Sequence, residues 1–177
     1  MDLKGTKTEG NLAAAFAGES QMSCRYAFYA DRAEKDGYGR VAAIFRELSS
    51  VEREHARLWF RIINYGDVPK TRDNLLAAAR GERLEHAGVY SRYARDARAE
   101  GFPRIADLFG QVARVEQEHE RLFLSIYEEL ENGSIFEGGE HSGWRCAGCG
   151  HRLTSGSAPD RCPVCSAPRG EFARIEN

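Results

Sequence analysis

Apolar residues recur at helical spacing along most of the chain, from about residue 8 to residue 132. Glycine and proline interrupt the pattern where helices commonly end or begin. The pattern predicts four helices, each of about 25 to 30 residues and about 40 Å long: Thr8 to Asp36, Gly39 to Tyr65, Thr71 or Asp73 to Gly101, and Pro103 to Asn132. Short turns within each pair and a longer Gly66 to Lys70 connection indicate a mainly α fold. We expect two helical hairpins in a ferritin-like four-helix bundle, whose connection between pairs crosses over.

The composition changes after Gly133, where a polar, glycine-containing stretch leads into a cysteine-rich segment with little helical periodicity. We therefore predict a bundle domain at residues 1–134, a linker at 135–142 and a small domain at 143–177.

The segment from Asp36 to Leu58 runs parallel to the segment from Glu100 to Leu122 without a gap, which indicates an internal repeat. Each copy contains a similar short motif, which is Val-Glu-Arg-Glu-His at 51–55 and Val-Glu-Gln-Glu-His at 115–119. A glutamate and a histidine three residues apart lie on one face of a helix, so each motif is a candidate half of a metal site.

Two further glutamates, each preceded by glycine, lie on the other two predicted helices. One glutamate from each of two helices and a Glu-x-x-His pair from each of the others make the constellation of carboxylate-bridged di-iron or di-manganese sites. Hard carboxylates with one imidazole per metal suit iron or manganese. The alternative is a set of surface ion-pair residues, which two copies at one offset with apolar flanks disfavour. The predicted ligands are Glu19, Glu52, His55, Glu82, Glu116 and His119.

The two halves of the repeat differ by one residue. Glu19 and Glu82 are 63 residues apart, whereas Tyr26 and Tyr90 are 64 apart. A π-bulge is the simplest way to absorb the extra residue, and we predict that it turns Glu85 inward as another ligand. Tyr26 and Tyr90 are candidates to hydrogen-bond ligand carboxylates or a bound oxygen species, with an ordinary core role as the alternative.

Four of the five cysteines form two Cys-x-x-Cys pairs separated by twelve residues: Cys146, Cys149, Cys162 and Cys165. A segment of about 35 residues cannot bury a sufficient core, so a tetrahedral four-thiolate metal site is expected to supply folding energy. Zinc ribbons share this spacing, but a neighbouring redox site favours iron. Trp144 and Phe172 could shield the metal. Cys24 is expected to be a small buried helix residue without a function.

The net charge of −2, without a basic cluster, argues against a nucleic-acid partner. The sequence has no membrane-spanning apolar run, and its N-terminus lacks the apolar core of a signal peptide. These features predict a cytoplasmic protein without a membrane partner.

The chain resembles rubrerythrin over almost its full length, through the motifs Ala15 to Gln21, Glu52 to His55, Gly81 to His86, Glu116 to His119, Trp144 to Cys146, and Cys162 with Pro163. The resemblance implies a ferritin-like di-iron domain followed by a rubredoxin-like iron domain, and a peroxidase that reduces hydrogen peroxide to water in oxidative-stress defence. It implies that Glu52 and Glu116 bridge two irons, with Glu19, His55, Glu82, Glu85 and His119 as terminal ligands. One iron would exchange His55 for Glu85 on oxidation. Zinc or manganese are alternative occupants.

The resemblance also implies partners. An NAD(P)H-linked reductase or a rubredoxin would donate electrons, and the chain would form a homodimer or larger homo-oligomer. Two other functions stay open at this point. A ferroxidase or iron-storage protein would share the bundle but would not need an electron-donating domain. A zinc-ribbon interaction protein would be colourless, with zinc at the four cysteines.

Overall fold

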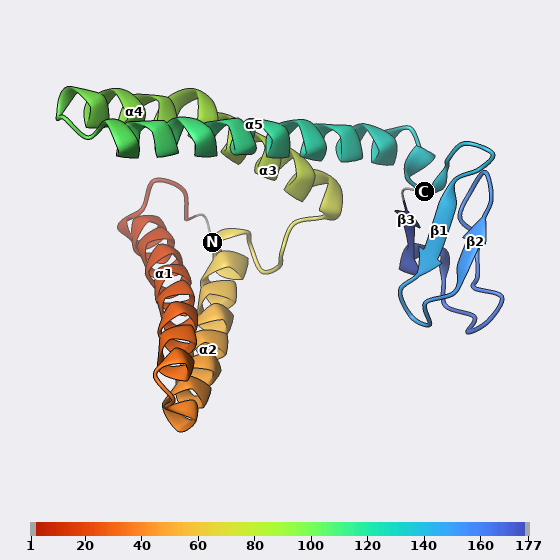
Figure 1. Cartoon of the computed structure of the whole chain (residues 1–177), viewed down its shortest axis with the longest axis horizontal. Helices are drawn as coiled ribbons and strands as arrows, with labels where there is room; N and C mark the ends of the chain where they lie inside the picture. Colours follow the sequence, from red (N-terminus) through yellow and green to blue (C-terminus); the bar gives the residue numbers. More distant parts are fainter. Residues whose placement is uncertain (1–2, 176–177) are drawn as a thin grey trace. The chain divides into compact units, whose positions relative to one another are not determined.

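The computed structural model describes residues 3–175 and divides into two compact units between Lys70 and Thr71. The first unit is a helical hairpin of α1 (Lys7–Lys35) and α2 (Gly39–Ile63), which pack side by side (Figure 1). Small residues line the contact, since Ala30, Ala33, Ala42 and Ala56 are all buried. No helix among residues 3–175 is both long and apolar enough to cross a membrane.

The second unit begins with another helical hairpin. Its first arm consists of α3 (Thr71–Leu84), the π-helical turn η1 (Glu85–Val89) and α4 (Tyr90–Ala99), and its second arm is α5 (Pro103–Glu131). In the π-turn, the N–H of Tyr90 donates to the carbonyl of Glu85, five residues back. The bulge predicted between Glu82 and Tyr90 is therefore confirmed.

The turns of the two hairpins repeat each other in detail. Gly37 and Gly101 adopt φ values of 83° and 85°, a left-handed conformation that glycine accommodates at low cost. The N–H of the next residue, Tyr38 or Phe102, then donates to a carbonyl five residues back at 2.8 Å in both hairpins. This closing pattern at helix C-termini reverses the chain within a few residues.

The small domain follows α5. After η2 (Ser134–Phe136), three short strands form an antiparallel sheet in the order β2-β1-β3: β1 (Gly143–Cys146), β2 (Arg152–Thr154) and β3 (Phe172–Ile175). The 3-10 turn η3 (Arg169–Glu171) leads into β3. Trp144 lies opposite Leu153 on one side and Arg174 on the other. The core of this domain contains Trp144, Cys146, Ala158, Cys162 and Phe172.

These elements confirm the predicted fold class: a mainly α, ferritin-like protein with four helical arms and a small C-terminal rubredoxin-like domain. The predicted domain limits at 134 and 143 stay predictions. The expected burial of Cys24 is wrong, because its side chain lies exposed on α1. Helical periodicity places a residue on a face of its helix, but it does not say whether another helix covers that face.

Candidate metal centres

The first candidate half-site lies entirely within the first hairpin. Glu19 on α1 meets Glu52 and His55 on α2, and one potential ligand atom from each lies within 4.8 Å of the others. His55 Nδ1 is 2.9 Å from Glu52 Oε2. The three-residue spacing on α2 produces this pair, and the hairpin adds the glutamate from α1.

The second half-site repeats this arrangement within the second hairpin. Glu82 on α3 meets Glu116 and His119 on α5, again with ligand atoms within 4.8 Å of one another. His119 Nδ1 is 2.7 Å from Glu116 Oε2. The structure thus brings the six predicted glutamate and histidine ligands together as two groups of three, each inside its own unit.

The electrostatics of the second half-site favour a bound cation. Partial burial raises the pKa of Glu82, and the nearby negative charge and hydrogen bond of Glu116 raise it further, while His119 lowers it. Burial also raises the pKa of Tyr90, together with the charges of Glu85, Glu116 and Glu82. Neighbouring carboxylates repel one another when they are ionised, and a metal ion would remove that repulsion. The donor set, two carboxylates and one imidazole, fits iron or manganese.

Glu85 has a less direct position. Its side chain is exposed and lies outside the group formed by Glu82, Glu116 and His119. It is nevertheless part of the same acidic neighbourhood, because its negative charge contributes to the raised pKa of Glu82 and of Tyr90. Its role as a ligand stays a prediction.

One contact near this half-site was missed by the sequence analysis. His86 Nε2 is 2.6 Å from Glu120 Oε2, and both side chains are only 14% exposed. Arg83 adds a weaker contact to the same carboxylate at 3.9 Å. The partners are 34 residues apart on different helices, so no local spacing signals the pair. The corresponding positions of the first hairpin, Met22 and Ala56, carry no ionisable group.

Aromatic side chains next to the two half-sites also repeat. Tyr26, Tyr29 and Phe45 form a cluster with ring-centre distances of 5.5 to 6.3 Å. The equivalent cluster of the second hairpin has distances of 5.5 to 6.4 Å, and its members are Tyr90, Tyr93 and Phe109. Both predicted functional tyrosines therefore belong to an aromatic cluster, and burial and the charges of Glu85, Glu116 and Glu82 raise the pKa of Tyr90.

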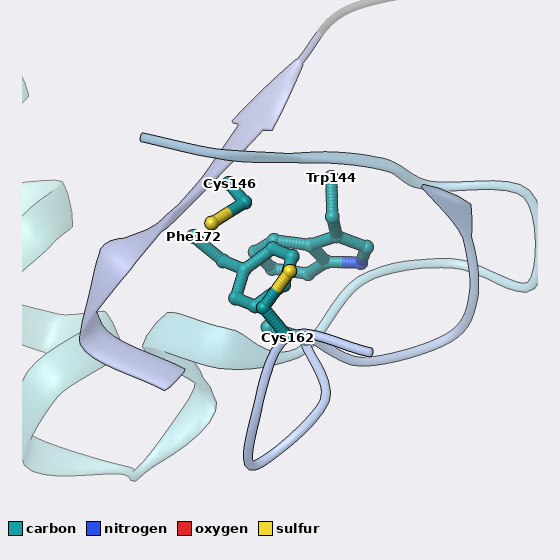
Figure 2. Close-up of a cluster of buried hydrophobic side chains, with 5 residues drawn as sticks. Trp144, Cys146, Cys162 and Phe172 are labelled. Carbon is teal, nitrogen blue, oxygen red and sulfur yellow. The ribbon is translucent and has the colours of Figure 1, made fainter. Parts of the chain in front are cut away.

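The four predicted cysteines meet at one point of the small domain. Cys146 Sγ is 3.7 Å from Cys165 Sγ, and Cys149 Sγ is 3.7 Å from Cys162 Sγ. A tetrahedron with metal–sulfur bonds of about 2.3 Å has sulfur–sulfur edges of about 3.8 Å. The cage therefore fits a metal ion that is bound by four thiolates. Trp144 and Phe172 lie beside Cys146 and Cys162 (Figure 2), which supports their predicted shielding role.

The local backbone also favours thiolate formation at one of these cysteines. Although desolvation raises the pKa of Cys162, backbone hydrogen bonds at Cys165 and Val164 and hydrogen bonds with neighbouring thiols lower it to about 7. A hydrogen bond at the His151 backbone lowers the pKa of Cys149, but contacts with the other thiols and desolvation raise it to about 12. Only thiolates bind metal strongly, so the lowered pKa of Cys162 favours metal binding at the cage.

Comparisons with known proteins match both parts of the chain to one family. A family model described as rubrerythrin matches residues 10–71 and 73–144, and one described as the rubredoxin-like domain of rubrerythrin matches residues 144–173. A rubrerythrin of Porphyromonas gingivalis is 42% identical over 181 residues, covering 96% of this chain and 90% of that protein. A rubrerythrin of Nitratidesulfovibrio vulgaris is 38% identical, covering 96% of this chain and 95% of that protein. A solved structure of nigerythrin in a mixed-valence state is 24% identical. The match covers 98% of this chain and 91% of the nigerythrin chain, with a TM-score of 0.37.

Proposed function

Because the chain belongs to the rubrerythrin family, we propose that it is a non-haem di-iron peroxidase that reduces hydrogen peroxide to water. One observation carries the proposal. Two half-sites of matching geometry, each with two glutamates and a histidine, occur in the same chain as a cage of four cysteines. Carboxylate-rich di-metal sites and four-thiolate iron sites are both suited to changes of oxidation state.

In this proposal the two half-sites together hold two iron ions. Glu52 and Glu116 would hold the ions as shared ligands, and Glu19, His55, Glu82, Glu85 and His119 would complete the ligand set. The five carboxylates bring a charge of about −5 against +4 from two ferrous ions, so the loaded centre is nearly neutral. Loading should therefore stabilise the protein. The bound irons would supply the two electrons that peroxide reduction needs, replenished one at a time by iron in the four-cysteine cage.

The chain's own side chains would handle protons and position the substrate. Burial and the charge of Glu85 raise the pKa of the Tyr90 hydroxyl, so this hydroxyl and that carboxyl would form a short path along which a proton can move. Tyr26 would take the equivalent place beside the first half-site. Glu85, carried on the π-turn, would change its distance to the metal when the oxidation state changes, since ferric iron prefers carboxylate to imidazole.

The proposed partners follow from the same chemistry. The four-cysteine site would accept electrons from an NAD(P)H-linked reductase or a rubredoxin. Cys149 and Cys165 are exposed, so an electron donor can approach this side of the cage. We also propose that the protein is a homo-oligomer and that it lies in the cytoplasm. Cell fractionation tests its location.

Anaerobic mixing of the fully reduced, iron-loaded protein with hydrogen peroxide tests the function. We expect fast oxidation of both iron sites, followed by visible absorption of the four-cysteine centre. The matched control is the Glu52→Ala/Glu116→Ala double variant, which keeps the four cysteines and should oxidise at least about 100-fold more slowly. Oxidation by oxygen with growth of an iron mineral would instead identify an iron-storage protein. A colourless protein with zinc at the cysteines would identify an interaction protein.

A further inference from the structure

Each hairpin presents a stripe of large apolar side chains that its own unit leaves exposed. On α2, five members of the stripe are 39% to 48% exposed: Val41, Ile44, Leu48, Val51 and Leu58. On α5, five members are 37% to 58% exposed: Ile105, Leu108, Val112, Val115 and Leu122. Contiguous apolar surface of this kind marks an interface. We call these sets the α2 stripe and the α5 stripe.

The two stripes match each other and carry the metal ligands. Every member of the α2 stripe has its counterpart on the α5 stripe at an offset of 64 residues, and so does His55, with His119. The spacing alternates between three and four residues once the histidines are included, which is the spacing of helices that pack along a common seam. Covering the stripes therefore also brings the two half-sites face to face.

The connection between the hairpins limits how one copy can cover its own stripes. Between the end of α2 at Ile63 and the start of α3 at Thr71 lie seven residues, which span at most about 28 Å. Glu52 lies eleven residues before the end of α2, and Glu82 lies eleven residues after the start of α3. Each ligand is therefore about 17 Å along its helix from the connection.

A ferritin-like bundle has one long crossover connection, because its second and third helices run in the same direction. If Glu52 and Glu82 lie at the same height along the bundle axis, the end of α2 and the start of α3 lie about 33 Å apart along that axis, on opposite sides of the metals. Seven residues cannot bridge that distance. They would suffice only in a different, up-and-down bundle with α2 and α3 antiparallel.

We propose that two copies of this chain exchange hairpins, so that the α2 stripe of each copy packs on the α5 stripe of the other. The inference rests on the proposed di-metal function and deepens it, because each metal centre then takes Glu19, Glu52 and His55 from one copy and Glu82, Glu116 and His119 from the other. The dimer contains two such centres, and neither forms within one copy.

Complementation between two defective copies tests this sharing. One copy, with a first tag, carries Glu52→Gln and His55→Gln; the other, with a second tag, carries Glu116→Gln and His119→Gln. Co-expressed and purified through both tags, the mixed dimer should bind about two ions beyond those of its cysteine cages, because one centre combines two intact half-sites. No ions beyond the cages would overturn the proposal.

A reciprocal pair gives the opposite result. Here a wild-type copy is combined with a copy that carries all four substitutions. With exchanged hairpins every centre contains one damaged half-site, so no ions beyond the cages should bind. About two ions would show that a copy closes its own centre and would overturn the proposal.

A cross-link gives a readout that does not depend on metal. Antiparallel α2 and α5 that place residues 52–55 against residues 116–119 bring position 48 opposite position 122. The variant Leu48→Cys/Leu122→Cys, made with Cys24→Ser, should yield a covalent dimer on oxidation, seen on a non-reducing gel. A cross-linked monomer, or no cross-link, would overturn the exchange. If the dimer forms but the wild-type protein binds no ions beyond its cages, the proposed function fails and the exchange stands.

Discussion

The two helical hairpins share their turn, their aromatic cluster and their three-ligand half-site, yet they differ at one turn of helix. Where α1 is regular, the matching arm of the second hairpin contains the π-turn with Glu85. Where the first hairpin has Met22 and the buried Ala56, the second has the paired His86 and Glu120. The second hairpin has therefore acquired additional acidic and hydrogen-bonding groups on the same framework.

In the proposed function, this difference separates the groups that hold the metal ions from the groups that adjust them. Two equivalent half-sites are enough to hold two ions symmetrically. The extra residue of the π-turn brings Glu85 into the acidic neighbourhood of Glu82 and Tyr90, and the His86–Glu120 contact ties the turn to α5. In the proposed function, this asymmetric pair of half-sites would give the two metals different environments, which an exchange of ligand at only one of them requires.

The largest effects should come from the groups that the hairpins share. Glu52→Ala and Glu116→Ala should each lower peroxide reduction by more than about 100-fold, because each would remove a carboxylate that we propose both metals share. Iron content and stopped-flow oxidation by peroxide measure the effect. The exposed neighbours Glu54 and Glu118 supply controls, since Glu54→Ala and Glu118→Ala should leave both unchanged. A much milder effect of one of these two variants would show that the two half-sites do not contribute equally to peroxide reduction.

Removing the extra residue tests the difference itself. Deletion of Gly88 should restore a regular helix and turn Glu85 away from Glu82, lowering peroxide reduction by about 10- to 100-fold with little loss of helix. Circular dichroism and peroxide kinetics measure the two results. Gly88→Ala is the matched control, because an added Cβ there meets no atom within 4 Å. Full activity in the deletion variant would show that the π-turn is not needed.

Converting the polar pair into the residues of the first hairpin should change stability. His86→Met leaves the carboxylate of Glu120, only 14% exposed, with the distant Arg83 alone, and should lower the free energy of unfolding by about 1–3 kcal/mol. The double variant His86→Met/Glu120→Ala should recover most of this loss, since neither polar partner is left behind. Urea unfolding of the metal-free protein measures both. Additive losses would show that the two residues act independently.

The smallest effect should distinguish the two tyrosines. Tyr90→Phe removes a hydroxyl whose pKa is raised by burial and by the charges of Glu85, Glu116 and Glu82, and it should lower peroxide reduction by about two- to tenfold. Tyr26→Phe is the matched variant in the first hairpin and should have the weaker effect, with iron content unchanged in both. An equal or larger effect of Tyr26→Phe would assign the proton-handling role to the other hairpin.

Much of this molecule follows from local sequence patterns. The four helical arms, the π-turn and the six glutamate and histidine positions depend on spacings of a few residues, and a duplicated segment makes each spacing visible twice. The four cysteines were likewise evident, because two Cys-x-x-Cys pairs specify a cage whatever the fold around them.

Other features depend on which faces meet in space. Cys24 has the periodicity of a buried position but lies exposed, and His86 and Glu120 form a close pair although 34 residues separate them. The sequence by itself determined the helices, the half-sites and the cysteine cage, because helical geometry and ligand spacing act over short stretches of chain. Only the tertiary structure decided the polar pair and the uncovered stripes, because burial depends on partners that are distant along the chain.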